Sequence, residues 1–197
     1  KVVYSDPFKI KESANDADLI LITHDHGDHY GPGNIKKLVK DGTRFCAGAA
    51  IAAMLQKDLD IPEEHITVVE QYGVYEPLDG VWVQAVPGWN GTQLAGTGVG
   101  YVLRLDGCRY YLSGDTDTLE QNAECDVLFC VCDGRFNMPD YLNRIPAEIR
   151  AMRSLPGVVV PYHFDNASEE GNGRRLADEL NRLGIPALLL EDRGQEV

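Results

Sequence analysis

The segment Thr23–Gly33, THDHGDHYGPG, constrains this 197-residue sequence more than any other feature, and it directly follows the apolar run ADLILI. The apolar run has no polar alternation, which predicts a strand buried on both faces of a sheet. Three histidines and two aspartates then fall within six residues. Ionisable side chains gathered this closely after a buried strand indicate ligands, and the alternative is a polar loop with scattered histidines.

The spacing inside the loop suits two adjacent metal ions. His24 and His26 are alternate residues of an extended segment and point the same way, so both can bind one ion. Asp28 and His29 follow a turn that Gly27 permits, and they can face a second ion. Imidazole and carboxylate are ligands for Zn, Fe, Mn and related divalent ions.

Composition excludes some classes of partner. The formal charge of −13 argues against binding to nucleic acid or to an anionic membrane, since phosphate binding needs a basic face. No apolar run approaches the ~20 residues that span a bilayer. The five cysteines are odd in number and show no disulfide framework, so we expect reduced thiols in a cytoplasmic protein. The length predicts one domain, residues 1–197.

Apolar patterning and turn residues predict the secondary structure. Strands are expected at 1–6, 18–23, 43–48, 65–70, 73–78, 81–86, 100–105, 109–113, 126–132, 157–163 and 187–191. Helices are expected at 34–40, 49–59, 145–154 and 173–183. Asp106-Gly107 predicts a tight hairpin. Runs of strands followed by strands mixed with helices favour stacked sheets with helices outside over a doubly wound parallel sheet.

Other polar residues also follow predicted strands: Asp6, Asn90, Asp115 and His163. Side chains on several strand-end loops can converge on one rim. Asp115, in YYLSGDTDT, could bridge two cations or serve as a turn or helix-capping aspartate. His163 ends VVVPYHF, where a lone histidine is more often structural. The presence of the histidine loop favours the ligand interpretation for both.

These motifs carry a resemblance. H-x-H-x-D-H after an apolar strand, then G-D-T-D, then a strand-end P-x-H, resembles the metallo-β-lactamase superfamily. The stretches DPF, AVPGWN and SGDTD are similar to its lactonase-like branch of small metal-dependent hydrolases, which includes ascorbate-phosphate lactonases. The resemblance runs from about Tyr4 to His163. It implies an α/β (α+β) fold, a four-layer αββα sandwich with the metals at one edge.

The resemblance also implies roles for individual residues. His24 and His26 would bind the first metal, Asp28, His29 and His163 the second, and Asp115 would bridge them. One or two divalent ions, Zn or Mn, would lower the pKa of a shared water towards ~7 so that hydroxide attacks an ester, lactone, amide or phosphoester. Activity would then depend on Asp28 and Asp115.

The sequence departs from the family pattern at two places. Where the superfamily usually has a third histidine for the first metal, VQAVPGWNGTQ offers Asn90. An amide oxygen is a weaker ligand, so the first site would bind loosely, prefer Mn or Mg, or stay empty. The usual opening strand pair before DPF has no counterpart, so one sheet would lack its first strands. A homo-oligomer would cover that edge.

Further residues are candidates for supporting roles. Asp6 could orient a histidine ligand or form a simple turn before Pro7, and Asp117 could support Asp115 or cap a helix. Candidates for contact with the substrate are Trp89, Arg135, Phe136 and Asn137. The alternatives for Trp89 and Arg135 are an ordinary rim aromatic and a surface cation.

The sequence therefore predicts a metal-dependent hydrolase acting on a small-molecule ester, lactone or phosphoester. One alternative is a non-catalytic protein with a single structural ion, suggested by Asn90. Another is a nuclease of the same superfamily, which the acidic composition and the lack of a basic stripe argue against.

Overall fold

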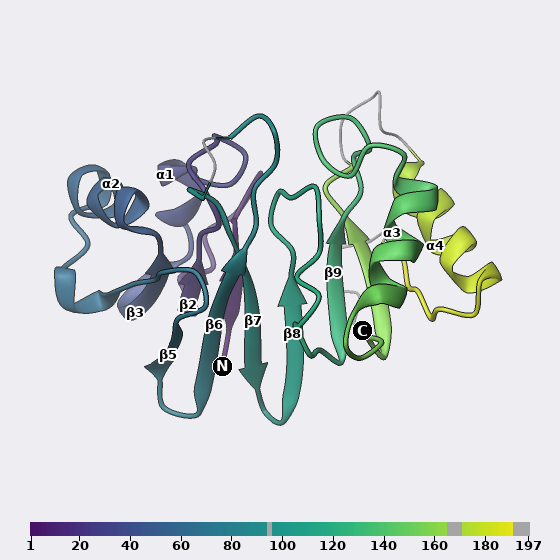
Figure 1. Ribbon diagram of the computed structural model, residues 1–197. Helices are drawn as coiled ribbons and strands as arrows, with labels where there is room; N and C mark the ends of the chain where they lie inside the picture. The colour runs from purple at the N-terminus through teal and green to yellow at the C-terminus, as the bar shows by residue number, and fades with distance from the viewer. Residues whose placement is uncertain (94–95, 165–170, 191–197) are drawn as a thin grey trace.

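The computed structural model describes residues 1–93, 96–164 and 171–190, whose strands form two β-sheets (Figure 1). The first sheet is parallel, with the strands in the order β1 (Val3–Ser5), β2 (Ala17–Leu21), β3 (Val39–Ala47) and β4 (Ile66–Val68). The second has the order β10 (Val158–Tyr162), β9 (Val127–Val131), β8 (Cys108–Leu112), β7 (Val99–Leu105), β6 (Val81–Pro87) and β5 (Val74–Leu78). Strands β5 to β8 pair antiparallel, and β8 to β10 pair parallel.

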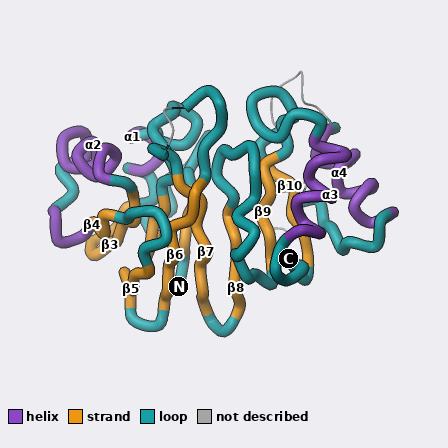
Figure 2. The backbone as a smooth tube through the Cα atoms, in the orientation of Figure 1, coloured by secondary structure: helices purple, strands orange, loops and turns teal. Residues whose placement is uncertain are grey.

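The helices lie on the two outer sides of the sheets (Figure 2). The bounds are α1 (Pro32–Ile35), α2 (Ala49–Leu59), α3 (Tyr141–Ala151) and α4 (Asn172–Arg182), with a short 3₁₀ helix η1 at Glu63–His65. Helices α1 and α2 cover the four-stranded sheet, and α3 and α4 cover the β9–β10 end of the six-stranded sheet. No helix among the described residues is long and apolar enough to cross a membrane.

Three apolar clusters hold these layers together. On β2, Leu19 and Leu21 pack between the two sheets, whereas Ile20 and the next residue after the strand, Ile22, pack under α1 and α2. This division follows from strand geometry, because successive side chains point to opposite faces. A third cluster joins β8, β9 and β10 to α3 and α4. Each apolar side chain fully removed from water contributes roughly 1.5–3 kcal/mol. The predicted αββα sandwich is confirmed.

Several predicted elements differ from those observed. The strand expected at 43–48 starts earlier, at Val39, and the one expected at 65–70 is shorter, Ile66–Val68. The helix expected at 34–40 is α1, which starts at Pro32 and ends at Ile35, because Val39 and Lys40 already belong to β3. The helix expected at 145–154 starts at Tyr141, so Pro146 lies inside it and not in its first turn. The strand expected at 187–191 is only a bridge between Ala187 and Val159, and Glu191 lies outside the described residues.

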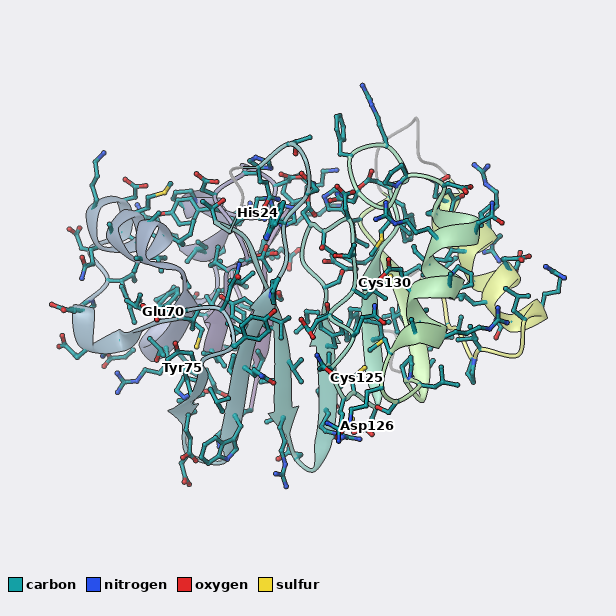
Figure 3. All side chains as sticks on the ribbon, viewed as in Figure 1. His24, Glu70, Tyr75, Cys125, Asp126 and Cys130 are labelled. Atoms are coloured by element: carbon teal, nitrogen blue, oxygen red, sulfur yellow. The ribbon has the colours of Figure 1, made fainter. Side chains whose placement is uncertain are left out.

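Strand directions bring the polar loops to one edge. Because β6, β8, β9 and β10 run the same way in the second sheet, their carboxyl ends share an edge. The loop after β8 turns at Gly114, whose φ of +64° favours glycine. A Cβ there would lie 2.8 Å from the Val99 carbonyl oxygen. Figure 3 shows His24 towards this edge and Asp126 towards the opposite end of the strands.

Candidate metal centre

The structure places six predicted ligands in two groups. His24, His26 and Asp115 form the first group, and Asp28, His29 and His163 form the second. Within each group, one nitrogen or carboxylate oxygen per residue lies within 4.8 Å of the others. Segments more than a hundred residues apart in the sequence thus meet at one point, as the strand-end positions predict.

Asp115 stands between the two groups. Its Oδ1 lies 3.4 Å from His29 Nε2 and 3.5 Å from His163 Nε2. Its Oδ2 lies 3.9 Å from His24 Nε2. One carboxylate therefore presents one oxygen to each group, which is the geometry of a bridging ligand. Asp28 Oδ2 completes the second group, 3.4 Å from His163 Nε2.

Unpartnered polar atoms test whether the site suits a cation. His24 and Asp115 are 2% and 5% exposed, and His24 Nε2 and Asp115 Oδ1 have no hydrogen-bond partner among the described residues. Buried polar atoms rarely stay unpartnered, because desolvation without a replacement bond is costly. His29 Nε2 and His163 Nε2 also face each other at 3.3 Å. Lone pairs aimed at a shared point fit a divalent ion.

The protonation states of the histidines differ between the groups. Burial, reinforced by the neighbouring imidazoles, lowers the pKa of His24 to about 2, so its ring is neutral and can ligate. For His163, burial lowers the pKa, but the hydrogen bond to Asp133 and the charges of Asp115 and Asp28 outweigh it and raise the pKa to about 9. In the metal-free fold His163 is therefore protonated near neutral pH, and the carboxylates of Asp133, Asp115 and Asp28 face that charge.

Asp6 supports His29. Asp6 Oδ2 lies 2.8 Å from His29 Nδ1, which leaves Nε2 facing Asp115. The same carboxylate accepts hydrogen bonds from the Thr23 backbone N–H at 2.8 Å and from Thr23 Oγ1 at 2.6 Å. Burial lowers the pKa of His29, but Asp6 and the nearby carboxylates raise it overall above its ordinary value. This geometry is that of a carboxylate that orients a histidine ligand.

Both Asp6 and His163 have backbone conformations that cost energy. Their φ angles are +43° and +60°, in the left-handed region that non-glycine residues seldom adopt. Such strain persists only where surrounding contacts hold it, and it concentrates at functional sites.

Asp133 supports His163, and the sequence reasoning did not identify it. Its side chain is fully buried, with Oδ2 3.4 Å from His163 Nδ1. Oδ1 accepts three backbone N–H groups, from Arg135, Phe136 and Asn137, at 2.7–3.1 Å. Burial raises its pKa, but the bonds from His163, Asn137 and the backbone outweigh this and lower it below its ordinary value. Its position directly after β9, at the same edge as the other ligands, is the signal that could have revealed it.

Asn90 and Asn137 are both buried. Asn90 Oδ1 accepts hydrogen bonds from the backbone N–H and the hydroxyl of Thr92, and its Nδ2 donates to Asn137 Oδ1. The amide of Asn90 is thus engaged within the protein, and a weak ligand role for it stays a prediction. Asn137 is 0% exposed, so it is not at the open mouth of the site, and its contact with a substrate stays a prediction.

The remaining candidates lie in the loops that follow β6, β8 and β9. Asp117 Oδ2 accepts from the Gly91 N–H at 3.2 Å, so it fixes the loop after β6. Trp89, in the same loop, is 38% exposed. The Arg135 guanidinium lies 4.6 Å from the Phe136 ring centre, and both side chains are exposed. Their contact with a substrate stays a prediction.

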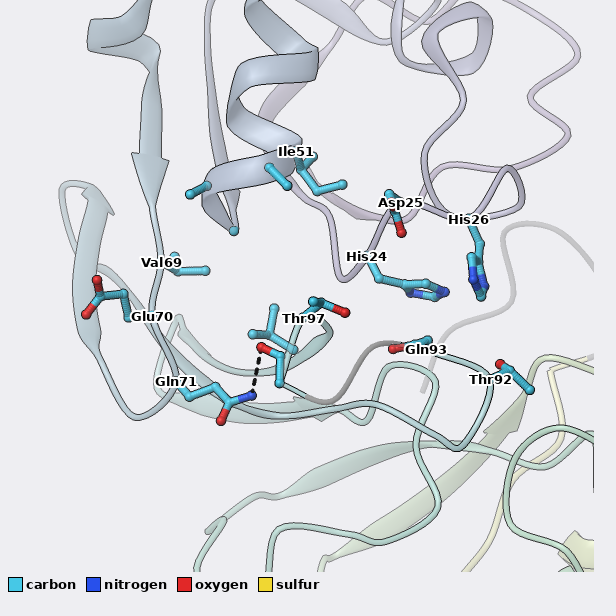
Figure 4. A pocket seen from close by; sticks show the side chains of 15 residues that line it. His24, Asp25, His26, Ile51, Val69, Glu70, Gln71, Thr92, Gln93 and Thr97 are labelled. Atoms are coloured by element: carbon cyan, nitrogen blue, oxygen red, sulfur yellow. Dashed lines mark hydrogen bonds between the residues drawn. The ribbon is translucent and has the colours of Figure 1, made fainter.

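Two cavities flank the ligands. One, of about 530 Å³, opens beside His24 and His26 (Figure 4). Its walls are the start of α2 and the segments around Gln71, Thr92 and Thr97. The other, of about 350 Å³, borders Asp28, His29 and His163, and Phe8, Leu112 and Phe129 give it an apolar side.

Comparisons with known proteins agree with this geometry. The family described as "Beta-lactamase superfamily domain" matches residues 1–163. A UPF0173 metal-dependent hydrolase of Pyrococcus abyssi is 34% identical over 78% of this chain and 69% of its own. Another, of Thermococcus kodakarensis, is 32% identical over 84% of this chain and 78% of its own.

Solved structures show the same fold. A putative metal-dependent hydrolase from Parabacteroides distasonis superimposes with a TM-score of 0.75 and 27% identity, covering 96% of this chain and 84% of that one. Igni18, a metallo hydrolase from Ignicoccus hospitalis, gives a TM-score of 0.72 over 88% of this chain and 76% of that one; at 19% identity this shows the fold alone. The chain therefore belongs to the metallo-β-lactamase superfamily, among its metal-dependent hydrolases.

Proposed function

We propose that this protein uses one or two divalent ions, Zn or Mn, to hydrolyse an ester, lactone or phosphoester bond of a small molecule in the cytoplasm. The observation that carries the proposal is Asp115, whose two oxygens face two separate ligand groups. Among the described residues the first group offers three protein ligands, the number typical of catalytic zinc sites, so a bound ion would keep a position for water or substrate. That open position favours an enzyme over a protein with one structural ion.

The chain's own residues would prepare this chemistry. Divalent ions at the site would supply hydroxide at neutral pH and stabilise the developing anion. His24 offers a neutral nitrogen, while Asp6 and Asp133 orient His29 and His163. Asp115 links the two ligand groups, because each of its oxygens faces one of them. Asp28, with its side chain 45% exposed, stands where the second group meets solvent.

The cavity beside His24 and His26 supports a small-molecule substrate. About 530 Å³ lies in the usual range for small-molecule sites. The α2 wall is built from Gly48, Ala49 and Ala50, whose small side chains leave room. The net charge of −13 argues against nucleic acid as the substrate.

Metal content and hydrolysis together test the function. We expect elemental analysis to find one or two equivalents of a divalent metal, and metal-loaded protein to hydrolyse members of a lactone and phosphoester panel. Chelation should abolish turnover, and metal return should restore it. A fully loaded protein that turns over no member of a broad panel, with a coordination shell that holds no water, would support the structural-ion alternative instead.

A substitution in the cavity wall tests the substrate site. Ala50→Trp should fill part of the cavity, because Ala50 lines it and its side chain is exposed. We expect KM to rise ~10-fold or more, the cost of losing ~1.4 kcal/mol of binding, with the metal content and melting temperature unchanged. Ala53→Trp is the matched control, since Ala53 is exposed on the same helix and does not line this cavity. Equal KM values for the two variants would place substrate binding elsewhere.

A further inference from the structure

Four buried or half-buried polar side chains form a continuous chain beneath the metal centre. Asn90 Nδ2 donates to Asn137 Oδ1, and Asn137 Nδ2 donates to Asp133 Oδ2 at 2.5 Å. Asp133 Oδ2 in turn lies 3.4 Å from His163 Nδ1. This series of side chains runs from the loop after β6, through the loop after β9, to the end of β10.

We propose that Asn137 is a positioning residue that holds the Asp133 carboxylate behind His163. The proposal rests on the hydrolase function above and deepens it. Its physical basis is the chemistry of the carboxamide, which offers two donors and an acceptor at once. Its Nδ2 donates to Asp133 Oδ2, and its Oδ1 accepts from the Asn90 amide.

The surroundings of Asp133 show what Asn137 adds. The three backbone N–H groups satisfy Asp133 Oδ1 alone. Oδ2 is shared between Asn137 and His163. Without the Asn137 donor, Asp133 Oδ2 would have His163 as its one remaining partner. The carboxylate could then rotate, and the imidazole would no longer be fixed with Nε2 towards Asp115. Supporting groups of this kind typically change metal affinity by ~10–100-fold.

The same amide ties the second ligand group to the cavity. Asn90 precedes Thr92 and binds it through Oδ1, and Thr92 lines the cavity beside His24 and His26. Asn137 therefore links a wall of the proposed substrate cavity to the carboxylate that orients His163. A displacement of Thr92 would reach His163 through the hydrogen bonds of Thr92 to Asn90, Asn90 to Asn137 and Asn137 to Asp133, and then through the Asp133–His163 ion pair.

The competing explanation is that Asn137 only stabilises a buried loop, and Asn172 provides the matched control. Asn172 is also buried, and its Nδ2 donates to the Asp133 backbone carbonyl at 2.7 Å. It anchors the same loop, but within the described part of the chain its amide bonds to side chains and backbone carbonyls and not to the Asp133 carboxylate. Asn172→Ala thus removes a comparable buried amide and leaves the Asp133 carboxylate held by Asn137.

The test measures Zn²⁺ affinity by competition with a chromophoric chelator, independently of any substrate. We expect Asn137→Ala to weaken zinc binding at the tighter of the two sites by ~10–100-fold. Asn172→Ala should leave that zinc affinity within about twofold of the parent protein. Cobalt-substituted Asn137→Ala should show altered visible absorption, because the imidazole geometry changes. Asn137→Ser, which keeps one donor, should fall between the two and serves if the alanine variant does not fold.

Each outcome decides the matter. Parent-like zinc affinity and cobalt spectra in Asn137→Ala or Asn137→Ser would overturn the positioning role, as would an equal loss in Asn172→Ala. A parent protein that binds zinc tightly and hydrolyses nothing would refute the proposed function while leaving the positioning role intact. The two failures are therefore distinguishable.

Discussion

Asp115→Asn is expected to lose at least ~10²–10³-fold in kcat, the scale observed when one key charge-stabilising group is removed. The amide keeps the shape of the side chain but replaces one oxygen with a donor that cannot ligate a cation. Oδ1 faces His29 and His163, while Oδ2 faces His24. Either orientation of the amide therefore leaves one ligand group without its oxygen ligand. Asp28→Asn should likewise reduce activity, through the second group alone.

The stability of the metal-free Asp115→Asn protein separates this effect from misfolding. Burial raises the pKa of Asp115, which shows that the charged form is held at a cost when no metal is bound. Removing that charge should leave the metal-free melting temperature unchanged or higher. Asp126→Asn is the control: it weakens the exposed pair with Arg109, far from the site, and should retain full activity. Full activity in Asp115→Asn would end the bridging hypothesis.

Local pattern was enough to predict the histidine loop and several elements. The helix at 49–59 and the hairpin around Asp106-Gly107 appear as expected, since each combines a strong periodicity with clear turn residues. The helix containing Pro146 was placed too late, because proline is typical of a first turn. Here the Asp140 carbonyl accepts from the N–H groups of Asn143 and Arg144, which closes an earlier turn.

The positions of Asp133 and Asn137 beneath the metal centre depend on the strand order, which no local sequence pattern reveals. The strand-end rule predicted the meeting of Asp115 and His163, but only the order β8-β9-β10 places the β9 loop between them. In that loop the three N–H bonds to Asp133 curl the backbone and bury Asn137, while Arg135 and Phe136 stay exposed. Sequence reasoning took Asn137 with its two neighbours as a substrate contact, because burial within a short loop depends on this curl.

Asp6→Asn is expected to lower zinc affinity at the second group ~10–100-fold, with a loss in kcat at least as large. An amide that donates to His29 Nδ1 would move the ring proton to Nε2, the nitrogen that faces Asp115, and so block ligation. Chelator competition measures the affinity. Asp18→Asn is the matched control, because Asp18 ties β1 to β2 through the Val2 N–H but does not contact a ligand.

The pH dependence of stability checks that Asp6 acts through His29. The raised pKa of His29 in the metal-free fold means that its proton stabilises the protein fully below the ordinary value of 6.5. This contribution is lost as the pH rises through the folded-state pKa. Asp6→Asn removes the main partner of that proton, so the melting-temperature gap to the parent should be widest below pH 6.5 and should narrow at higher pH. A gap that stayed constant with pH, together with parent-like zinc affinity, would mean that Asp6 serves only the Thr23 turn, because its bonds to Thr23 do not titrate with the imidazole.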